Sequence, residues 1–514
     1  MQFDSARLRA FAPLLTALSL APLAAPALPR KQDASLRVVL VGSGPDLDYN
    51  QVAIESNVRY LNRLLPSDSS RTILFADGNV QSKTVLYEDD PRQLPVGEYL
   101  FEIAVKSRNE RDKDLHGQYK APNLGSRCDG ANTPPTLRKV LDGIGAEAGT
   151  KTSPLFLYFT GHGSINPRSI DNNAYDMWGD KKFSVTDLAS KLESLPPQIP
   201  VTLVMVQCHS GAFANLIFKG GNPDNEATDR DFAGFFAAIK ENVAAGCTSE
   251  LNEDDYRDFT SYFFAALTGR DRLGRKVPSA DYNKDGRIGM DEAYCYTLAN
   301  DRSIDVPVST SDVFLRKYLP ITGDAEGKLL EAKYRDVQSW ATPAQKYALD
   351  HLSKEARYGG EDRIKRAYSE MRLGVAQNQR RSEFRRSPVE RDYDTLQQDV
   401  KRTLLGRFPE LNDPKSEDYS VAKKAAIAFL TQHRDDGPYK EIRAAYSALS
   451  KSFSESESKQ IEDAHRLRLI RLAKSVLLAH RLRESRDEKT KTRYEKLVVS
   501  EGRTLLPPSS GWKN

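Results

Sequence analysis

Leu155-Phe-Leu-Tyr-Phe-Thr-Gly-His-Gly163 and Val201-Thr-Leu-Val-Met-Val-Gln-Cys-His-Ser-Gly211 are two apolar runs that each end in a short polar sequence. Short apolar runs stopped by glycine are typical of strands that are buried on both faces of a parallel sheet. We therefore predict that His162 stops one strand and that Cys208 follows the next. Since parallel strands end at a common edge, where such sheets bind their ligands, we expect the two side chains to lie within reach of each other.

The chain around these runs alternates predicted strands with predicted helices. The strands are Leu36–Val41 and Arg71–Phe75, and the helices are Val52–Leu65, Thr133–Gly145 and Val185–Leu195. Further helix and strand are expected within Phe232–Cys247 and Phe259–Leu267. This alternation predicts an α/β fold, with a mainly parallel sheet that carries helices on both faces.

Composition divides the chain into three regions. Met1–Ala27 has a basic start, an apolar stretch and a small-x-small ending, which is typical of a cleaved signal peptide; an uncleaved membrane anchor is the alternative. Residues 28–322 hold the predicted α/β domain, in which residues 78–132 are polar and are interpreted as a long insertion or loop. Residues 323–514 are rich in Lys, Arg, Glu and Ala, and we predict a separate charged helical domain there, with helices within residues 417–433, 439–453 and 461–482.

Charge and cysteine content exclude several classes of protein. The net charge of +4 over 514 residues gives no basic footprint for nucleic acid. No run after the predicted signal approaches ~18 apolar residues, so we expect no membrane span in the mature chain and a periplasmic or secreted location. Four cysteines are too few for a disulfide scaffold, although Cys128 could pair with Cys247 or Cys295.

The pairing of His162 with Cys208 suggests nucleophilic chemistry. A thiol attacks a carbonyl when an imidazole takes its proton, and glycine-rich turns can supply N–H donors to the resulting oxyanion. If each residue is considered alone, Cys208 is interpreted as a small buried residue and His162 as a surface residue. His209 follows the nucleophile directly, so on an extended chain its side chain should point elsewhere, and we interpret it as structural.

Leu157-Tyr-Phe-Thr-Gly-His-Gly163 and Val204-Met-Val-Gln-Cys-His-Ser-Gly-Ala-Phe213 resemble the His and Cys blocks of the caspase-like clan of cysteine peptidases, most closely its legumain-type branch and related bacterial secreted proteins. The resemblance covers about residues 36–300. It implies that His162 is the acid–base group and Cys208 the nucleophile, and that the N–H groups of Gly163 and Cys208 form the oxyanion hole. Legumains use an Arg-His pair to bind asparagine, and Tyr49–Val52 has no such pair.

Two further sites are predicted. The resemblance places the specificity pocket near Ala245–Glu250, where Glu250 could attract a basic substrate residue. Asp281-Tyr-Asn-Lys-Asp-Gly-Arg-Ile-Gly-Met-Asp-Glu292 matches the twelve-residue EF-hand loop. The expected calcium ligands are Asp281, Asn283, Asp285, the Arg287 carbonyl and Glu292. Pro278 weakens the entering helix, so we predict a half EF-hand with a structural Ca²⁺, and no organic cofactor.

The sequence supports several functions for this scaffold. The leading hypothesis is a cysteine endopeptidase that acts on exported proteins or peptides. A transpeptidase or ligase would use the same thioester, and a non-catalytic binding protein would use only the fold. By analogy with legumains, the helical region could cover the active site. Arg380-Arg381 and Arg385-Arg386 could be a self-processing site, although a solvated charged helix face is the favoured interpretation.

Overall fold

The computed structural model describes residues 36–505, apart from Ser67 and residues 89–93, 106–117, 148–152, 382–386 and 414–415. The predicted signal peptide at residues 1–27 lies outside these ranges, as do Arg385 and Arg386. Arg380 and Arg381 end a helix. No helix in the described part of the chain combines the length and the apolar character that a membrane crossing needs.

A mainly parallel sheet forms the centre of the fold. Its main path has the order β10-β9-β8-β5-β1-β2. The strands are β1 (Arg37–Ser43), β2 (Ser70–Phe75), β5 (Leu155–Ser164), β8 (Val201–Met205), β9 (Phe232–Phe236) and β10 (Val308–Ser309). Only β10 is antiparallel to its neighbour on this path. The predicted α/β class is therefore confirmed.

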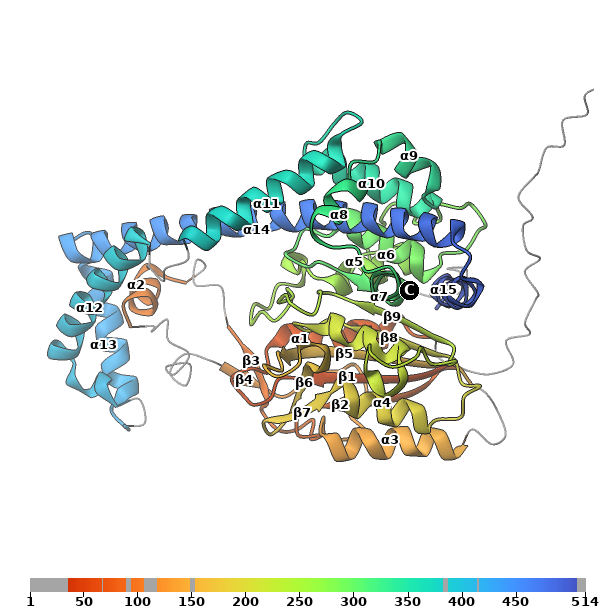
Figure 1. Cartoon of the computed structure of the whole chain (residues 1–514). Coiled ribbons are helices and arrows are strands. Elements are labelled where there is room, and N and C mark those ends of the chain that lie inside the picture. Colours follow the sequence, from red (N-terminus) through yellow and green to blue (C-terminus); the bar gives the residue numbers. More distant parts are fainter. Residues whose placement is uncertain are drawn as a thin grey trace, which may run out of the picture. The chain divides into compact units, whose positions relative to one another are not determined.

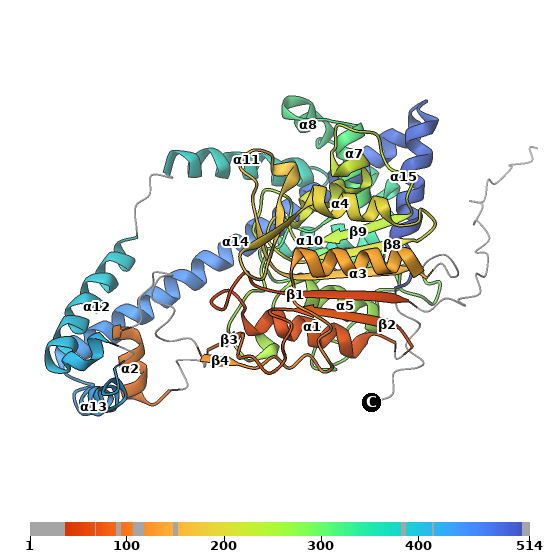
Figure 2. The same ribbon diagram turned by 90° about the horizontal axis from the view of Figure 1, so that it is seen from below.

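Helices cover both faces of the sheet. On one face α3 (Pro134–Glu147) and α4 (Val185–Ser194) pack onto the strands, and α1 (Val52–Leu64) and α5 (Phe259–Thr268) pack onto the other (Figure 2). Alternate residues of β5 enter the two cores, with Leu157 on the α3 and α4 side and Tyr158 on the α1 and α5 side. Burial on both faces explains the continuous apolar runs of the sheet, such as Val38–Val41 in β1 and Leu155–Phe159 in β5.

Strand β5 runs further than the sequence predicts. The glycines around His162 were expected to stop the strand, but β5 continues to Ser164. Its last residues pair antiparallel with β6 (Ala174–Met177), which in turn pairs with β7 (Lys181–Ser184). Gly161 has a φ of +143°, and a Cβ there would lie 2.2 Å from the Ser43 carbonyl oxygen. Glycine thus lets the strand change partner without ending, and His162 lies within a strand.

The polar stretch 78–132 is more ordered than the sequence predicts. It contains β3 (Val85–Tyr87) and β4 (Gln118–Lys120), which pair with each other, and between them the helix α2 (Val96–Val105). Leu100 and Phe101 of α2 are fully buried in one cluster with residues from the C-terminal helices. The insertion therefore shares a hydrophobic core with the helical region.

The region after residue 323 is helical, as predicted (Figure 1). Following α6 (Met290–Asn300) and α7 (Thr310–Tyr318), its helices are α8 (Gly323–Leu329), α9 (Tyr334–Trp340), α10 (Pro343–Glu355), α11 (Arg363–Arg381), α12 (Pro388–Arg407), α13 (Tyr419–Gln432), α14 (Gly437–Glu484) and α15 (Glu488–Glu501). The two separate helices predicted within 439–482 are one continuous helix of 48 residues, α14. It packs against α10, α11 and α12.

A buried arginine attaches α14 to the loop that follows α6. Arg468 is completely buried, and its guanidinium donates to the carbonyls of Asp301 (2.6 Å), Ser303 (2.9 Å) and Asp305 (2.7 Å). It also lies 3.4 Å from the Asp301 carboxylate, which is equally buried. Five donors in a rigid fork suit such a site, because they satisfy several carbonyls at once.

Replacing Arg468 with methionine should destabilise the fold by about 3 kcal/mol or more, because it leaves buried carbonyls and the Asp301 carboxylate without a partner. We expect a lower thermal midpoint and a lower urea midpoint. Arg481→Met on the same helix is the matched control, since Arg481 is exposed and its loss should cost only about 0.5 kcal/mol. Equal midpoints for the two variants would contradict this role for Arg468.

Candidate active site

His162 is held at the end of β5 by contacts from the start of α1. Its Nε2 atom lies 2.9 Å from Gln51 Oε1, and the Tyr49 ring meets the imidazole edge-on at 5.5 Å between centroids. With the Gln51 oxygen as acceptor, Nε2 carries the ring proton and the lone pair stays on Nδ1. The segment Tyr49–Val52 was considered from the sequence only for a substrate-binding Arg-His pair. Its contact with His162 was not expected, since a contact across more than 100 residues leaves no local pattern.

Cys208 follows β8 and meets the end of β5. The two strands pair in parallel as far as Phe159 opposite Met205, beyond which β5 passes through Gly161 and pairs with β6. Gly163 confirms the close approach of the two segments, because a Cβ at this position would lie 2.2 Å from the Cys208 carbonyl oxygen and 2.7 Å from Gln207 Cγ. The structure therefore brings together the two segments that carry the predicted dyad.

The Cys208 thiol contacts the backbone of Ala244. The Ala244 N–H donates to Sγ at 3.3 Å, and Sγ lies 3.8 Å from the Ala244 carbonyl oxygen. Burial raises the pKa of the Cys208 thiol above its usual range, and the hydrogen bond with Ala244 only partly offsets this. The resting side chain is therefore a thiol at neutral pH, so that attack on a carbonyl requires a base to remove its proton.

The loop at Ala244–Cys247 is fixed by buried groups. The fully buried Asp305 accepts from the Ala245 N–H at 2.6 Å and from the Phe259 N–H at 3.1 Å. At the other end of the loop, the Cys247 thiol lies 3.3 Å from the carbonyl oxygen of Gly161, the residue before His162. A second thiol thus borders the candidate site. The sequence alone left Cys247 as a possible disulfide partner of Cys128, and in the structure both are free thiols.

His209 is separate from this arrangement. Its Nδ1 atom lies 3.2 Å from the Lys240 carbonyl oxygen, and its backbone has a left-handed φ of 60°. Burial lowers the pKa of the His209 imidazole, which disfavours its charged form. The backbone at His209 is therefore not extended as expected, and the structural role of this residue stays a prediction.

Glu250 lies at the edge of the region. It is exposed, its carbonyl accepts from the Tyr256 hydroxyl at 2.7 Å, and its backbone forms a bridge with Glu88 next to β3. Among the described residues, no contact links the Glu250 carboxylate to His162 or Cys208. Its role in a specificity pocket remains a prediction.

The predicted calcium loop has the turn that its sequence pattern requires. Gly286 has a φ of +81°, and its N–H donates to Asp281 Oδ2 at 3.0 Å, while the Asp285 N–H donates to Asn283 Oδ1 at 2.9 Å. Glu292 is buried at the start of α6 and accepts from the Tyr282 and Asn283 N–H groups. No helix leads into the loop, since α5 ends at Thr268.

The donor set of this loop fits a hard cation. Three carboxylates, one amide oxygen and the Arg287 carbonyl come from the positions that an EF-hand uses. In the described part of the chain, no group of three or more His, Cys, Asp or Glu side chains is placed to share a metal. This leaves calcium untested, because amide and carbonyl oxygens belong to the expected ligand set.

Comparisons with known proteins do not assign this chain to a family. No protein-family model matches it, and no curated protein matches it either. The function has to be argued from the site itself.

The raised pKa of Cys208 predicts how its alkylation depends on pH. In a Cys247→Ser background, the rate of iodoacetamide labelling of Cys208 should still rise above pH ~8.5, the usual thiol pKa, because burial keeps the thiol protonated. Peptide mapping by mass spectrometry at successive pH values measures this rate. A rate that levels off near pH 7 would instead show a preformed thiolate–imidazolium pair, and His162→Ala would then abolish the low-pH plateau.

Calcium should stabilise the folded chain. At a free concentration a hundredfold above the dissociation constant, a site that exists only in the folded state contributes about 2.7 kcal/mol. We expect the thermal midpoint to be higher in Ca²⁺ than in chelator, and Asp285→Asn to reduce this difference. Asp324→Asn, an exposed carboxylate on α8, is the control and should keep the full difference. Equal midpoints for the wild type in Ca²⁺ and in chelator would refute a structural calcium site.

Proposed function

We propose that the chain is a cysteine endopeptidase of the caspase and legumain type that hydrolyses exported proteins or peptides outside the cytoplasm. The observation that carries this proposal is the close approach of two strand ends. Gly163, next to His162, packs directly on the carbonyl of Cys208. A thiol and an imidazole on adjacent, rigid strand ends are the parts that acyl transfer through a thioester needs.

The resting protonation states indicate the order of events. The Cys208 thiol holds its proton, and the His162 ring has its lone pair on Nδ1 when Gln51 accepts from Nε2. In the proposed reaction His162 takes the thiol proton as Sγ attacks the peptide carbonyl, and then gives it to the leaving amine. Water next attacks the thioester, releases the acid product and returns the proton to Cys208.

The oxyanion would be stabilised by backbone N–H groups. Gly163 and Cys208 are the residues proposed to donate to it. The Cys208 N–H donates to no backbone carbonyl among the described residues, which keeps it available for this role. The absence of a Cβ at Gly163 lets the two segments approach each other.

Around the dyad we propose two supporting features. Glu250 would attract a basic substrate side chain, because it is an exposed carboxylate on the segment that follows the Ala244–Cys247 loop. A Ca²⁺ ion at Asp281–Glu292 would stiffen the start of α6, the helix that leads into the Asp301–Asp305 loop. Both features are supported by position and donor chemistry alone.

The test compares residues 28–514 as wild type, Cys208→Ala and His162→Ala on a peptide library that varies the residue before the cut. Cleavage by the wild type alone would support the proposal. A preference for a basic residue before the cut would support the role of Glu250. Release of peptides joined to an added amine would indicate a transpeptidase. If the wild type cleaves nothing while Cys208 is alkylated readily, the peptidase proposal fails for the protein in this form.

Gly163→Ala gives a sharper test of the geometry. Its Cβ would displace the Cys208 carbonyl, so we expect kcat to fall by about a hundredfold, as for loss of an oxyanion donor. Gly143→Ala is the matched control, since a Cβ at Gly143 meets no atom within 4 Å. Equal activity of the two variants would argue against an oxyanion hole at Gly163.

A further inference from the structure

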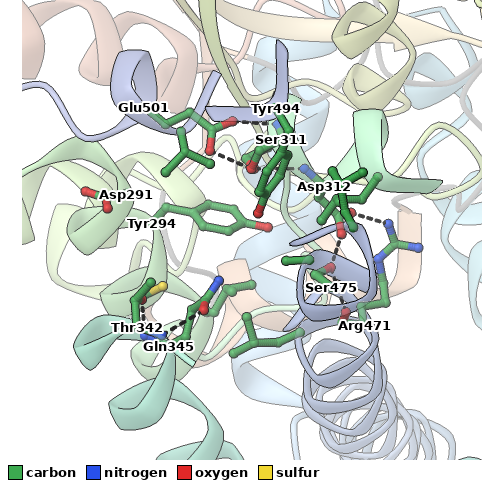
Figure 3. A pocket seen from close by; sticks show the side chains of 18 of the residues that line it. Asp291, Tyr294, Ser311, Asp312, Thr342, Gln345, Arg471, Ser475, Tyr494 and Glu501 are labelled. Carbon is green, nitrogen blue, oxygen red and sulfur yellow. Dashed lines mark hydrogen bonds and ion pairs between the residues drawn. The ribbon is translucent and has the colours of Figure 1, made fainter. Parts of the chain in front are cut away.

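A cavity of about 300 Å³ lies between the end of the α/β region and the last two helices. Its lining residues come from β10, α6, α7, α14 and α15 and from the start of α10, where Thr342 and Gln345 lie (Figure 3). The apolar part of its lining includes Leu298, Leu315, Leu472, Ala479, Leu482 and Val498. This volume is in the range of small-molecule sites, which combine apolar walls with a few placed polar groups.

Arg471 and Asp312 line one wall of the cavity, and Arg316, which is not among the lining residues, shares the Asp312 carboxylate with Arg471. Asp312 accepts from Arg471 Nη2 at 2.8 Å and from Arg316, through Nε at 3.1 Å and Nη2 at 2.9 Å. Ser475 also donates to Asp312 (Figure 3). Two guanidinium groups against one carboxylate leave this cluster with one positive charge in excess.

Arg471 is the incompletely satisfied member of the cluster. Its Nε atom is buried and has no hydrogen-bond partner among the described residues. Burial, and then repulsion from Arg316, lower the pKa of the Arg471 guanidinium, so the surroundings disfavour its charge. A buried, unpaired donor on an excess cation is a site that an anion would stabilise.

The acidic residues elsewhere on the lining do not neutralise this cluster. Glu501 accepts from Thr310 Oγ1 and from both the N–H and the hydroxyl of Ser311, and burial raises its pKa to about 7. At neutral pH it carries only part of its charge. Asp291 accepts from the Glu292 N–H at 2.9 Å, and no ion pair links it to Arg471 among the described residues. Arg483 and Lys491 line the cavity together with Glu495, so these three residues add no net negative charge.

We propose that this cavity binds a monocarboxylate with an apolar body, whose carboxylate pairs with Arg471 and whose body fills the space between α6, α14 and α15. The proposal is independent of the proposed peptidase activity, because no lining residue belongs to the dyad. Such a ligand would connect α7 to the two last helices, and would so stabilise their packing on the α/β region.

The experiment titrates the intact mature chain with decanoate by isothermal calorimetry. Decanol and decyltrimethylammonium are the neutral and cationic probes of matched length. We expect one decanoate per chain and much weaker binding of the other two. Arg471→Met should weaken decanoate binding by about tenfold or more, the usual effect of losing a charge-assisted pair. Arg481→Met, exposed on the same helix, should bind as the wild type does.

A second variant guards against loss of folding in Arg471→Met. Ala479→Phe places a ring in the cavity from the α14 wall and leaves the Asp312 cluster intact, so it should abolish binding without changing the circular dichroism spectrum. Absence of decanoate binding to the wild type, equal binding of decanol, or unchanged binding to either Arg471→Met or Ala479→Phe would each overturn the proposal.

Discussion

The burial of one guanidinium in the loop after α6 is the constraint on which the arrangement of the site depends. The Arg468 guanidinium donates hydrogen bonds to the carbonyls of Asp301, Ser303 and Asp305, which would otherwise lack these donors. The loop so ordered presents the Asp305 carboxylate to the Ala245 N–H. Ala244, the preceding residue, holds the Cys208 thiol. An arginine more than 250 residues away in sequence thus supports the position of the candidate nucleophile.

This support has an energetic cost, because it places two carboxyl groups away from water. Burial raises the pKa of both Asp301 and Asp305, while Arg468 opposes the rise. Two carboxyl groups in one dry region disfavour each other's charge, so a single arginine has to stabilise the pair. Such an arrangement suits a rigid scaffold, in which the loop has one conformation only. A rigid loop at this point would keep the Cys208 thiol in a fixed position relative to the His162 imidazole, which comes from another strand.

The sequence predicted the parts of the molecule that carry regular apolar patterns. The parallel strands, α1, α3 and α4 follow from runs and periodicities that need no tertiary information. The two polar sequences that end β5 and β8 were expected to meet, and their segments do. The catalytic roles of His162 and Cys208 are still proposals, since no comparison with known proteins bears on them.

What the sequence did not show depends on long-range contacts. Gln51 and Tyr49 reach His162 across the sheet edge, and Cys247 reaches Gly161 from the loop after β9. The helix α2 was missed because its apolar residues sit in a long polar stretch, and only the C-terminal helices bury them. The extension of β5 past Gly161 needed β6 as a partner, and a strand's partner cannot be read from its own residues.

The position of α2 also determines how the chain can come apart. This helix belongs to the first quarter of the sequence, yet the Tyr393 hydroxyl of α12 donates to its Ile103 carbonyl at 2.6 Å, and α13 and α14 share its core. Cleavage of the chain between α11 and α12 would therefore not separate the two pieces. The two pieces would stay joined by α2 at one end of α14 and by Arg468 further along it. Unlike a propeptide that departs after one cut, the segment from α12 to α15 would persist as the second chain of a nicked molecule.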